Sequence, residues 1–186
     1  MSNRIYGVEV YEALDKLVEI NVNTGIVIWK ERVGNARFNT KFAGKDAGCF
    51  KKKENGIYCI ISFNFNGKMY RVARSNLIWW KYTGRLPFGV IDHKNHETSN
   101  DSIRQLRDVT DKENSMNVKK SVNRILPMGV YEYEYKGKIP KKKRYRAAVM
   151  YCGKCVRFGT YDTVEEAEAV VKQKRKELGF HDNHGS

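Results

Sequence analysis

The sequence 91-IDHKNHETSNDSIRQLRDVTDKEN-114 carries the strongest structural signals in the central part of the chain. A short β-type run ends at Asp92 and His93. After a polar loop, a second apolar pulse at Leu106 and Val109 indicates another strand. The stretch therefore predicts two strands joined by a loop, with an acidic residue and a histidine at the end of the first.

A helix is predicted to follow the second strand. Thr110 and Glu113 have the spacing of a capping box, in which each side chain bonds to the backbone of the other residue. Asn114 then lies in the first turn of this helix. Strand, loop, strand and helix can fold back so that Asp92 and Asn114 meet across a small gap, with His93 beside them.

The side chains expected to meet there suit the hydrolysis of a phosphodiester. The carboxylate of Asp92 and the amide oxygen of Asn114 are hard ligands that suit Mg²⁺ or Mn²⁺. A neutral imidazole at His93 could deprotonate a water molecule for attack on phosphorus. Each residue taken alone is typical of ordinary structure, so the prediction depends on the 22-residue spacing from Asp92 to Asn114 and on the pattern between them.

The charge of the chain favours a polyanionic partner. The 186 residues carry a net charge of +14, which favours nucleic acid ahead of an anionic membrane. Residues 1–90 hold 15 Lys and Arg against 7 Asp and Glu, residues 117–178 hold 16 against 7, and residues 91–116 hold 4 against 6. Two basic segments that flank an acidic one suit a protein that binds phosphates on both sides of a divalent cation. Chance clustering of charge on a solvated loop is the alternative.

Membrane and zinc-binding classes are disfavoured. No apolar run approaches the ~20 residues of a membrane span, and the N-terminus has no signal-peptide core, so a cytoplasmic protein is expected. The four cysteines are Cys49, Cys59, Cys152 and Cys155. Only the last two form a CxxC pair, and neither singleton has a partner at ligand spacing, so a hairpin turning at Gly153 is favoured over structural zinc.

The N-terminal part is predicted to be rich in β-structure. Two apolar runs around Asn23-Thr24-Gly25 indicate one hairpin, and the runs 57–63 and 68–72 around Asn66-Gly67 indicate a second. Residues 33–56 between the hairpins are polar and contain glycine, so we expect a loop there.

A short helix is predicted between the hairpins and the central stretch. The sequence SNLIWWKYTG at 75–84 has Ser75 or Asn76 as a candidate N-cap and Gly84 at its end. This helix leads into the turn at Pro87, just before the strand that carries Asp92.

A second module is predicted at residues 129–179, after a linker at 117–128. Three short strands are expected at 129–135, 144–151 and 155–160. A helix from Thr163 to about Leu178 follows them, because Thr163 and Glu166 form a capping box. The predicted domains are thus residues 1–116, the linker, residues 129–179 and a tail at 180–186.

The central stretch resembles the HNH endonuclease signature of phage-type homing endonucleases. The upstream sequences NTGIVIWK, KFAGK and NLIWWKYTGRLPFG also resemble that family, and the similarity covers about residues 15–118. The resemblance implies a compact ββα-metal core in which Asp92 and Asn114 bind one divalent metal, Mg²⁺ or Mn²⁺, and His93 is the general base. It implies a site-selective endonuclease that acts on double-stranded DNA. A single metal per chain favours nicking by a monomer, with no small-molecule substrate.

Two positions inside the signature depart from the family pattern. Gln105 stands where the family has an asparagine that orients the loop of the catalytic histidine. His96 stands where the family has a glycine, and must accept the backbone angle that the glycine served. The alternative is therefore a non-cleaving, sequence-specific DNA-binding regulator with a degenerate core. An RNA-binding protein fits the charge but not the motif.

The second module resembles the APETALA or ethylene-response-factor DNA-binding domain. The resemblance rests on GVY at 129–131, YRAAV at 145–149, RFGTY at 157–161 and TVEEAEA from Thr163. It implies a three-stranded antiparallel sheet that lies in the major groove of DNA, backed by one helix. The whole chain is therefore expected to be α+β: an HNH core with a β-hairpin extension at its N-terminus, followed by a small sheet packed on one helix.

Strand alternation predicts which side chains of the second module face DNA. Tyr145, Ala147, Val149, Val156 and Phe158 are expected to pack on the helix, and Arg146, Ala148, Met150, Cys155 and Arg157 to face outward. Phosphate contacts are expected from the basic tract that precedes them. The expected DNA-binding residues are Tyr131, Tyr133, Lys141, Lys142, Lys143, Arg144, Arg146 and Arg157. A solvated basic hairpin is the alternative.

Overall fold

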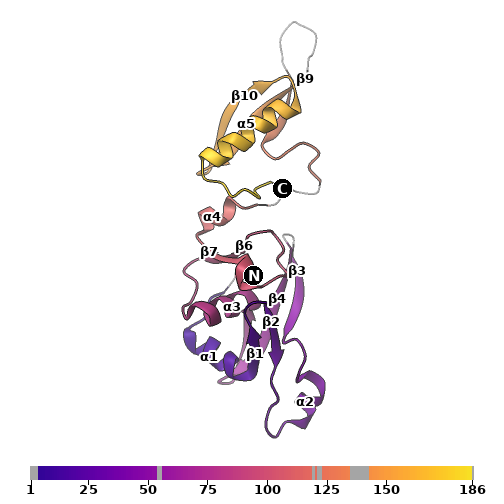
Figure 1. Cartoon of the computed structure of the whole chain (residues 1–186), viewed down its shortest axis with the longest axis vertical. Helices are drawn as coiled ribbons and strands as arrows, with labels where there is room; N and C mark the ends of the chain where they lie inside the picture. The colour runs from indigo at the N-terminus through magenta and orange to yellow at the C-terminus, as the bar shows by residue number, and fades with distance from the viewer. Residues whose placement is uncertain (1–3, 54–55, 119, 121–122, 135–142, 186) are drawn as a thin grey trace. The chain divides into compact units, whose positions relative to one another are not determined.

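The computed structural model describes residues 4–53, 56–118, 120, 123–134 and 143–185 (Figure 1). Within these residues the chain forms helices and small antiparallel sheets, which confirms the expected mixture of the two. The chain divides into two compact units, Met1–Asp111 and Lys112–Ser186. None of the described helices is long and apolar enough to cross a membrane.

Unit 1 begins with a helix, α1 (Val8–Leu17), which was not predicted within the N-terminal part expected to be rich in β-structure. Val10, Tyr11 and Leu14 are buried, at a spacing that places them on one face of a helix. The sequence analysis missed this helix, although its buried apolar residues repeat with the period of a helix rather than with the period of two.

The first predicted hairpin is confirmed. Strands β1 (Val18–Asn21) and β2 (Ile26–Trp29) pair antiparallel. The turn contains Gly25 at φ +73°, a conformation that disfavours side chains with a Cβ. The Asn21 side chain accepts hydrogen bonds from the backbone N–H groups of Asn23 and Thr24 and so stabilises the turn locally.

The second predicted hairpin is also confirmed, but it belongs to a three-stranded sheet. Strands β4 (Gly56–Phe65) and β5 (Lys68–Ala73) pair around the Asn66-Gly67 turn, and β3 (Gly48–Lys53) pairs with the other edge of β4. The prediction of a loop at residues 33–56 was therefore wrong. The segment is polar but forms an edge strand and a helix, α2 (Ala36–Phe42). Asn35 caps this helix, because its side chain accepts a hydrogen bond from the backbone N–H of Phe38.

The predicted short helix is confirmed as α3 (Arg74–Thr83), and it ends at Gly84 in the left-handed conformation with φ +71°. Its predicted cap was wrong. The N-cap position is Ala73, and Ser75 and Asn76 are buried in the first turn. The helix begins directly after β5, so packing on the core rather than a capping side chain fixes its start.

The central stretch forms the expected antiparallel pair followed by a helix. Strands β6 (Val90–His93) and β7 (Leu106–Val109) pair with Asp92 opposite Arg107 and with His93 opposite Leu106. A short 3-10 helix, η1 (Ile103–Gln105), precedes β7, and helix α4 (Asp111–Ser115) follows it. Ile91, Leu106 and Val109 are buried, which anchors the strand pair in unit 1.

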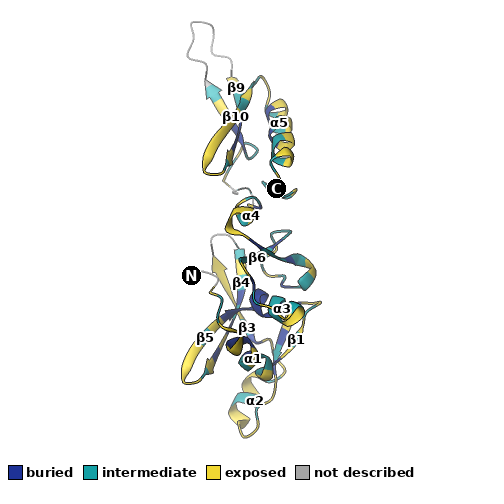
Figure 2. Ribbon diagram, turned by 90° about the vertical axis from the view of Figure 1, so that its left-hand side faces the viewer, coloured by how far each residue is buried: buried dark blue, intermediate teal, exposed yellow. Residues whose placement is uncertain are grey.

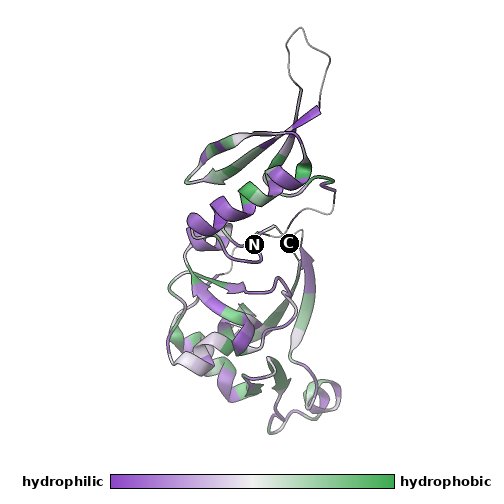
Figure 3. Cartoon of the chain, turned by 45° about the horizontal axis from the view of Figure 1, so that its top comes forward, coloured by the Kyte–Doolittle hydropathy of each residue, from purple (hydrophilic) through white to green (hydrophobic). Residues whose placement is uncertain are grey.

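Unit 2 contains the predicted three-stranded sheet and helix. The strands are β8 (Val130–Glu134), β9 (Lys143–Tyr151) and β10 (Lys154–Tyr161), with β9 in the centre. Helix α5 (Val164–Glu177) starts with the expected capping box at Thr163. In Figure 3 this helix is mostly hydrophilic with a few hydrophobic positions. The core of unit 2 includes Val130, Ala147, Val149, Ala167 and Val171.

The predicted faces of this sheet need two corrections. Val156 was expected in the core but is 36% exposed, and Ala148 was expected outward but is only 2% exposed. The strands change register between Arg157 and Gly159. Val156 precedes this bulge and lies in the edge strand β10, which leaves it more open to solvent, whereas Ala148 lies in the central strand β9 with a strand on either side.

The last residues of the chain pack within unit 2. Phe180 is buried in the core of this unit. The backbone N–H of His181 bonds to the carbonyl of Met116 at 3.2 Å, and that of Gly185 bonds to the carbonyl of Val118 at 2.9 Å. The segment just after α4 is therefore held by the end of the chain.

Candidate active site

The candidate site is centred on a buried pair formed by His93 and Asp101. The Nε2 atom of His93 lies 2.9 Å from Oδ1 of Asp101. His93 is 4% exposed and Asp101 is 2% exposed. An ionised carboxylate can only accept, so it favours the imidazole tautomer that carries its proton on Nε2.

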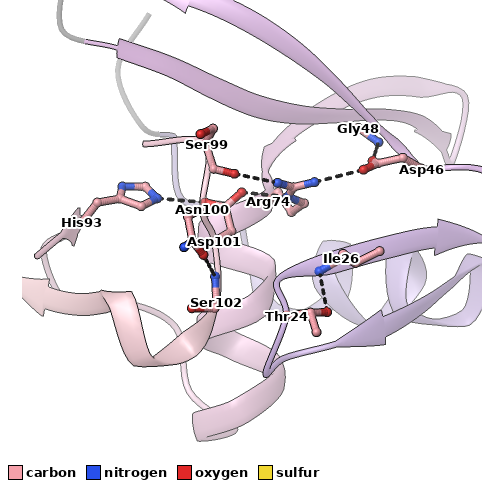
Figure 4. Close-up of polar contacts among 10 residues, drawn as sticks. All are labelled: Thr24, Ile26, Asp46, Gly48, Arg74, His93, Ser99, Asn100, Asp101 and Ser102. Carbon is pink, nitrogen blue, oxygen red and sulfur yellow. Dashed lines mark hydrogen bonds and ion pairs between the residues drawn. The ribbon is translucent and has the colours of Figure 1, made fainter. Parts of the chain in front are cut away.

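Arg74 holds the other oxygen of Asp101. Figure 4 shows its guanidinium between two carboxylates, with Nε 2.7 Å from Oδ2 of Asp101 and Nη1 3.2 Å from Oδ2 of Asp46. Its Nη2 atom donates to the carbonyl of Ser99 at 3.1 Å. Burial alone would lower the pKa of Arg74, but the hydrogen bond and the negative charges around it raise that pKa overall. Arg74 is therefore a fixed cation behind Asp101.

Two neighbouring elements fix the loop that carries Asp101. A Cβ added to Gly25, in the β1–β2 turn, would lie 2.5 Å from the carbonyl carbon of Asp101. The backbone of Ile103 donates to the carbonyl of Val22 at 2.9 Å. Further back in the loop, the Thr98 hydroxyl accepts from the backbone N–H of Ile57 at 2.8 Å. The N-terminal hairpin thus positions Asp101, and through it His93.

Asp92, the expected metal ligand, pairs across the hairpin with Arg107. The Nη2 and Nε atoms of Arg107 lie 2.7 Å and 2.9 Å from the same oxygen, Oδ2 of Asp92. Both side chains are mostly buried. The strand register explains the pair, because Asp92 lies directly opposite Arg107. A cation that binds Asp92 must share the carboxylate with this arginine or displace the arginine from it.

The other expected metal ligand, Asn114, lies in α4 and is half-buried. It belongs to unit 2, whereas Asp92 belongs to unit 1. Within the described residues, no three His, Cys, Asp or Glu side chains form a metal-binding group. A carboxylate and an amide are donor types that suit a hard cation, and a metal held by these two residues stays a prediction.

The two positions that depart from the family pattern are both in defined backbone geometry. His96 has φ +63°, so it adopts the left-handed conformation that a glycine would favour there. Gln105 ends η1, and its carbonyl accepts from the backbone N–H of Lys94 at 2.9 Å. This main-chain bond braces the residue after His93, whereas Asp101 contacts His93 through its side chain.

Tyr58 lies beside the site from strand β4. Its ring centroid is 6.4 Å from that of His93, in an edge-to-face arrangement. Burial, and then the negative charge of Asp92, raise the pKa of Tyr58. The phenol therefore stays neutral at physiological pH and can act as a hydrogen-bond donor next to His93.

The structure gives the expected DNA-binding residues of unit 2 different surroundings. Tyr131 is 44% exposed, and the Arg146 guanidinium carbon lies 4.3 Å from the Tyr133 ring centroid. Lys143 pairs with Glu132, and Arg144 pairs with Asp162. Arg157 is exposed. Lys141 and Lys142 lie outside the described residues.

Sequence reasoning missed Asp101 and Arg74. An acidic residue in the loop after a candidate catalytic histidine was a usable signal for Asp101, because such histidines commonly need an orienting carboxylate. Arg74 gave no local signal. It lies 27 residues before Asp101, at a strand-to-helix junction whose burial follows only from the tertiary fold.

Comparison with known families identifies one match. Residues 72–116 match the family model of the HNH endonuclease domain. No curated protein and no solved structure matches the chain. The matched range contains Arg74, Asp92, His93, Asp101 and Asn114. This part of the chain is therefore similar to an HNH endonuclease domain, which supports a nuclease that acts on DNA.

Proposed function

We propose that the protein is a metal-dependent, site-selective DNA endonuclease of the homing type that uses His93 as its general base. The observation that carries the proposal is the His93–Asp101 hydrogen bond, which lies inside the HNH match at the end of strand β6. A histidine oriented by a buried carboxylate is a recurrent arrangement for proton transfer.

The proton would move as follows. Asp101 accepts from the Nε2–H group of His93, so Nδ1 is the basic nitrogen of the ring in this tautomer. Nδ1 would take a proton from a water molecule as the water attacks phosphorus. The imidazolium that forms is stabilised by Asp101, and Arg74 keeps that carboxylate in place.

Asp92 and Asn114 would hold the divalent metal, Mg²⁺ or Mn²⁺, as the resemblance implies. The metal, when bound, would neutralise charge that develops on the phosphate oxygens. Arg107 lies opposite Asp92 in the strand register, holds the Asp92 side chain in place and supplies a positive charge beside its carboxylate. The ββα-metal core remains part of the proposal, as do the phage-type origin and nicking by a monomer.

Unit 2 would dock the enzyme on duplex DNA. Its three-stranded sheet backed by α5 has the architecture that the resemblance to the APETALA or ethylene-response-factor domain implies. Arg146 and Arg157 would contact base edges, and Tyr131 and Tyr133 would lie on the same surface. The ion pairs of Lys143 and Arg144 reduce the phosphate contacts that these two residues can offer.

Incubation of the full chain with supercoiled plasmid, with Mg²⁺ and with excess EDTA, tests the proposal. We expect relaxed or linear product only with the metal. The His93→Ala variant should cut at least ~10²-fold more slowly, the lower range for a positioned general base, with nearly unchanged DNA affinity. Equal rates for the variant and the parent would overturn the role of His93.

A non-cleaving DNA-binding regulator is the second candidate, and two observations favour it. Arg107 already neutralises Asp92, as a bound metal would, and His93 is buried. Sequence-specific DNA binding with no DNA cleavage in the presence of any divalent metal tested would support the regulator. Tighter binding of RNA than of DNA would exclude both candidates.

A further inference from the structure

One face of the sheet β3–β4–β5 remains open in unit 1. The opposite face packs Ile61, Phe63 and Val72 into the core. Side chains alternate along each strand, so the open face carries the residues at the alternate positions of the register. We define the open sheet face by Lys51 and Lys53 on β3, Tyr58 on β4, Met69 and Arg71 on β5, and Arg4 at its margin.

The open sheet face is hollowed and accessible. A concavity of about 1050 Å³ lies over it, lined by residues of all three strands and by Arg4 and Tyr6. Figure 2 shows the exposed stretches along β3 and β5, and Met69 on this face is 60% exposed. A surface of this size is large enough to receive part of a macromolecule.

The charge of the open sheet face is positive and uncompensated. Within the described residues, Arg4, Lys51, Lys53 and Arg71 have no carboxylate partner, and no Asp or Glu lines the concavity. Four other cations of unit 1, by contrast, each pair with an aspartate: Arg74, Lys81, Arg85 and Arg107. A cluster of unpaired cations on one exposed face attracts a polyanion.

The open sheet face leads directly to the candidate active site. Lys53 Nζ lies 4.7 Å from the Tyr58 ring centroid, and the Tyr58 ring in turn contacts the ring of His93. Tyr58 pairs with Lys51 in the register of the sheet. All of these residues belong to unit 1, so the track from the cations to His93 does not depend on unit 2.

We propose that the open sheet face binds the phosphate backbone of the duplex whose phosphodiester is cut at His93. Residues two apart on a strand, such as Lys51 and Lys53, are separated by about 6.6 Å, close to twice the rise of about 3.4 Å per phosphate of one DNA strand along the duplex axis. The inference rests on the proposed function, because the site at the end of the track makes DNA the expected polyanion. It adds a docking surface in unit 1 to the one proposed in unit 2.

The test compares two triple variants of the full chain. The first, Lys51→Gln/Lys53→Gln/Arg71→Gln, removes three cations of the open sheet face. The matched control, Lys16→Gln/Arg37→Gln/Lys41→Gln, removes two lysines and one arginine from exposed positions elsewhere in unit 1. Both should unfold at the temperature of the parent. Binding to a mixed-sequence DNA duplex is measured by fluorescence anisotropy over a range of salt concentrations, and plasmid cleavage is measured in parallel.

We expect the slope of log Kd against log salt to fall by roughly 2–3 for the first variant, at about 0.9 for each phosphate contact. The control should change the slope by less than about 1. A third variant, Lys51→Arg/Lys53→Arg/Arg71→Lys, keeps the charge and should restore the slope of the parent.

The outcomes separate this inference from the proposed function. If the parent neither binds nor cuts DNA, the proposed function fails. If the parent binds and cuts, but the first variant loses no more salt dependence than the control, only the open sheet face is ruled out as a docking surface. Tighter binding of an RNA duplex, lost in the first variant, would overturn DNA as the occupant.

Discussion

His93 and Asp101 share a buried hydrogen bond of 2.9 Å, although they are eight positions apart in the sequence. Both residues lie within the segment that matches the HNH endonuclease domain. The bond gives Asp101 the role of a positioning residue, since it contacts the proposed base and not the substrate.

We expect Asp101→Asn to lower kcat by about 10–100-fold while the affinity for DNA stays nearly constant. An amide can present its NH₂ group to Nε2 and so favour the wrong tautomer of His93. The matched control is Asp46→Asn, which removes the other carboxylate partner of Arg74 without touching His93. Equal loss of activity in both variants, or equal loss of thermal stability, would show that Asp101 acts through the Arg74 network alone.

Gln105 provides the competing assignment, because the resemblance gives the orienting role to its position. We expect Gln105→Ala to reduce kcat less than Asp101→Asn does, since Gln105 braces Lys94 through its main chain, which the substitution keeps. Single-turnover cleavage rates of the two variants decide between the residues. A larger loss of kcat in Gln105→Ala than in Asp101→Asn would show that Gln105, rather than Asp101, orients His93.

Arg107 is expected to compete with the metal for Asp92. Replacing it by glutamine removes two donors from Oδ2 of that carboxylate. We therefore expect Arg107→Gln to lower the Mg²⁺ concentration that gives half-maximal cleavage. Arg85→Gln is the control, because it breaks an analogous ion pair between Arg85 and Asp108, the residue that follows Arg107 on β7. An increased metal requirement in Arg107→Gln would show instead that the arginine supports the site.

Gly48 and Cys59 test the packing of the sheet. A Cβ at Gly48 would lie 1.9 Å from Sγ of the buried Cys59, so Gly48→Ala should destabilise unit 1 by about 1–3 kcal/mol. The double variant Gly48→Ala/Cys59→Ala should recover part of that loss, because the second change makes room for the first. Denaturant midpoints measure both effects, and additive losses would contradict the contact.

The same thiol predicts a dependence on alkaline pH. Burial is the main cause that raises the pKa of Cys59 to about 12 from its ordinary value of 9.0. Folding therefore favours the protonated thiol. Its contribution to stability is complete below pH 9 and is lost as the pH rises toward 12. We expect Cys59→Val to flatten the fall of the unfolding free energy in this range. An unchanged pH profile would contradict this assignment.

The two outward arginines of unit 2 are expected to set the preference for particular base pairs. Arg146→Gln and Arg157→Gln should each relax discrimination at a few positions by about 1–3 kcal/mol, while plasmid nicking continues. Binding to a library of randomised duplexes provides the measurement. A uniform loss of affinity across all sequences would reassign the arginines to phosphates.

Local sequence signals predicted much of the fold. The two hairpins were predictable because Gly25 and Asn66-Gly67 mark turns between apolar runs, and α5 was predictable from the capping box at Thr163. Helix α2 and strand β3 were missed because they bury almost nothing and so show little hydrophobic pattern. Hydrophobic periodicity finds an element only where one face of it is buried.

The candidate site was predictable only in part. The positions of Asp92 and His93 at a strand end followed from the motif. The partner of each followed from the tertiary fold: Arg107 reaches Asp92 through the strand register, and Asp101 reaches His93 through a loop fixed by the turn at Gly25. Contacts of this kind carry no periodic signal.

The backbone bonds between the end of the chain and residues 116–118 have a consequence for local unfolding. Helix α4 has five residues, too few to persist without tertiary support. The carbonyls of Met116 and Val118, just after it, are held by His181 and Gly185. Opening of the C-terminal end should therefore release α4 and Asn114 together. Amide hydrogen exchange would then show residues 114–118 and 181–185 losing protection at the same rate, as one cooperative unit.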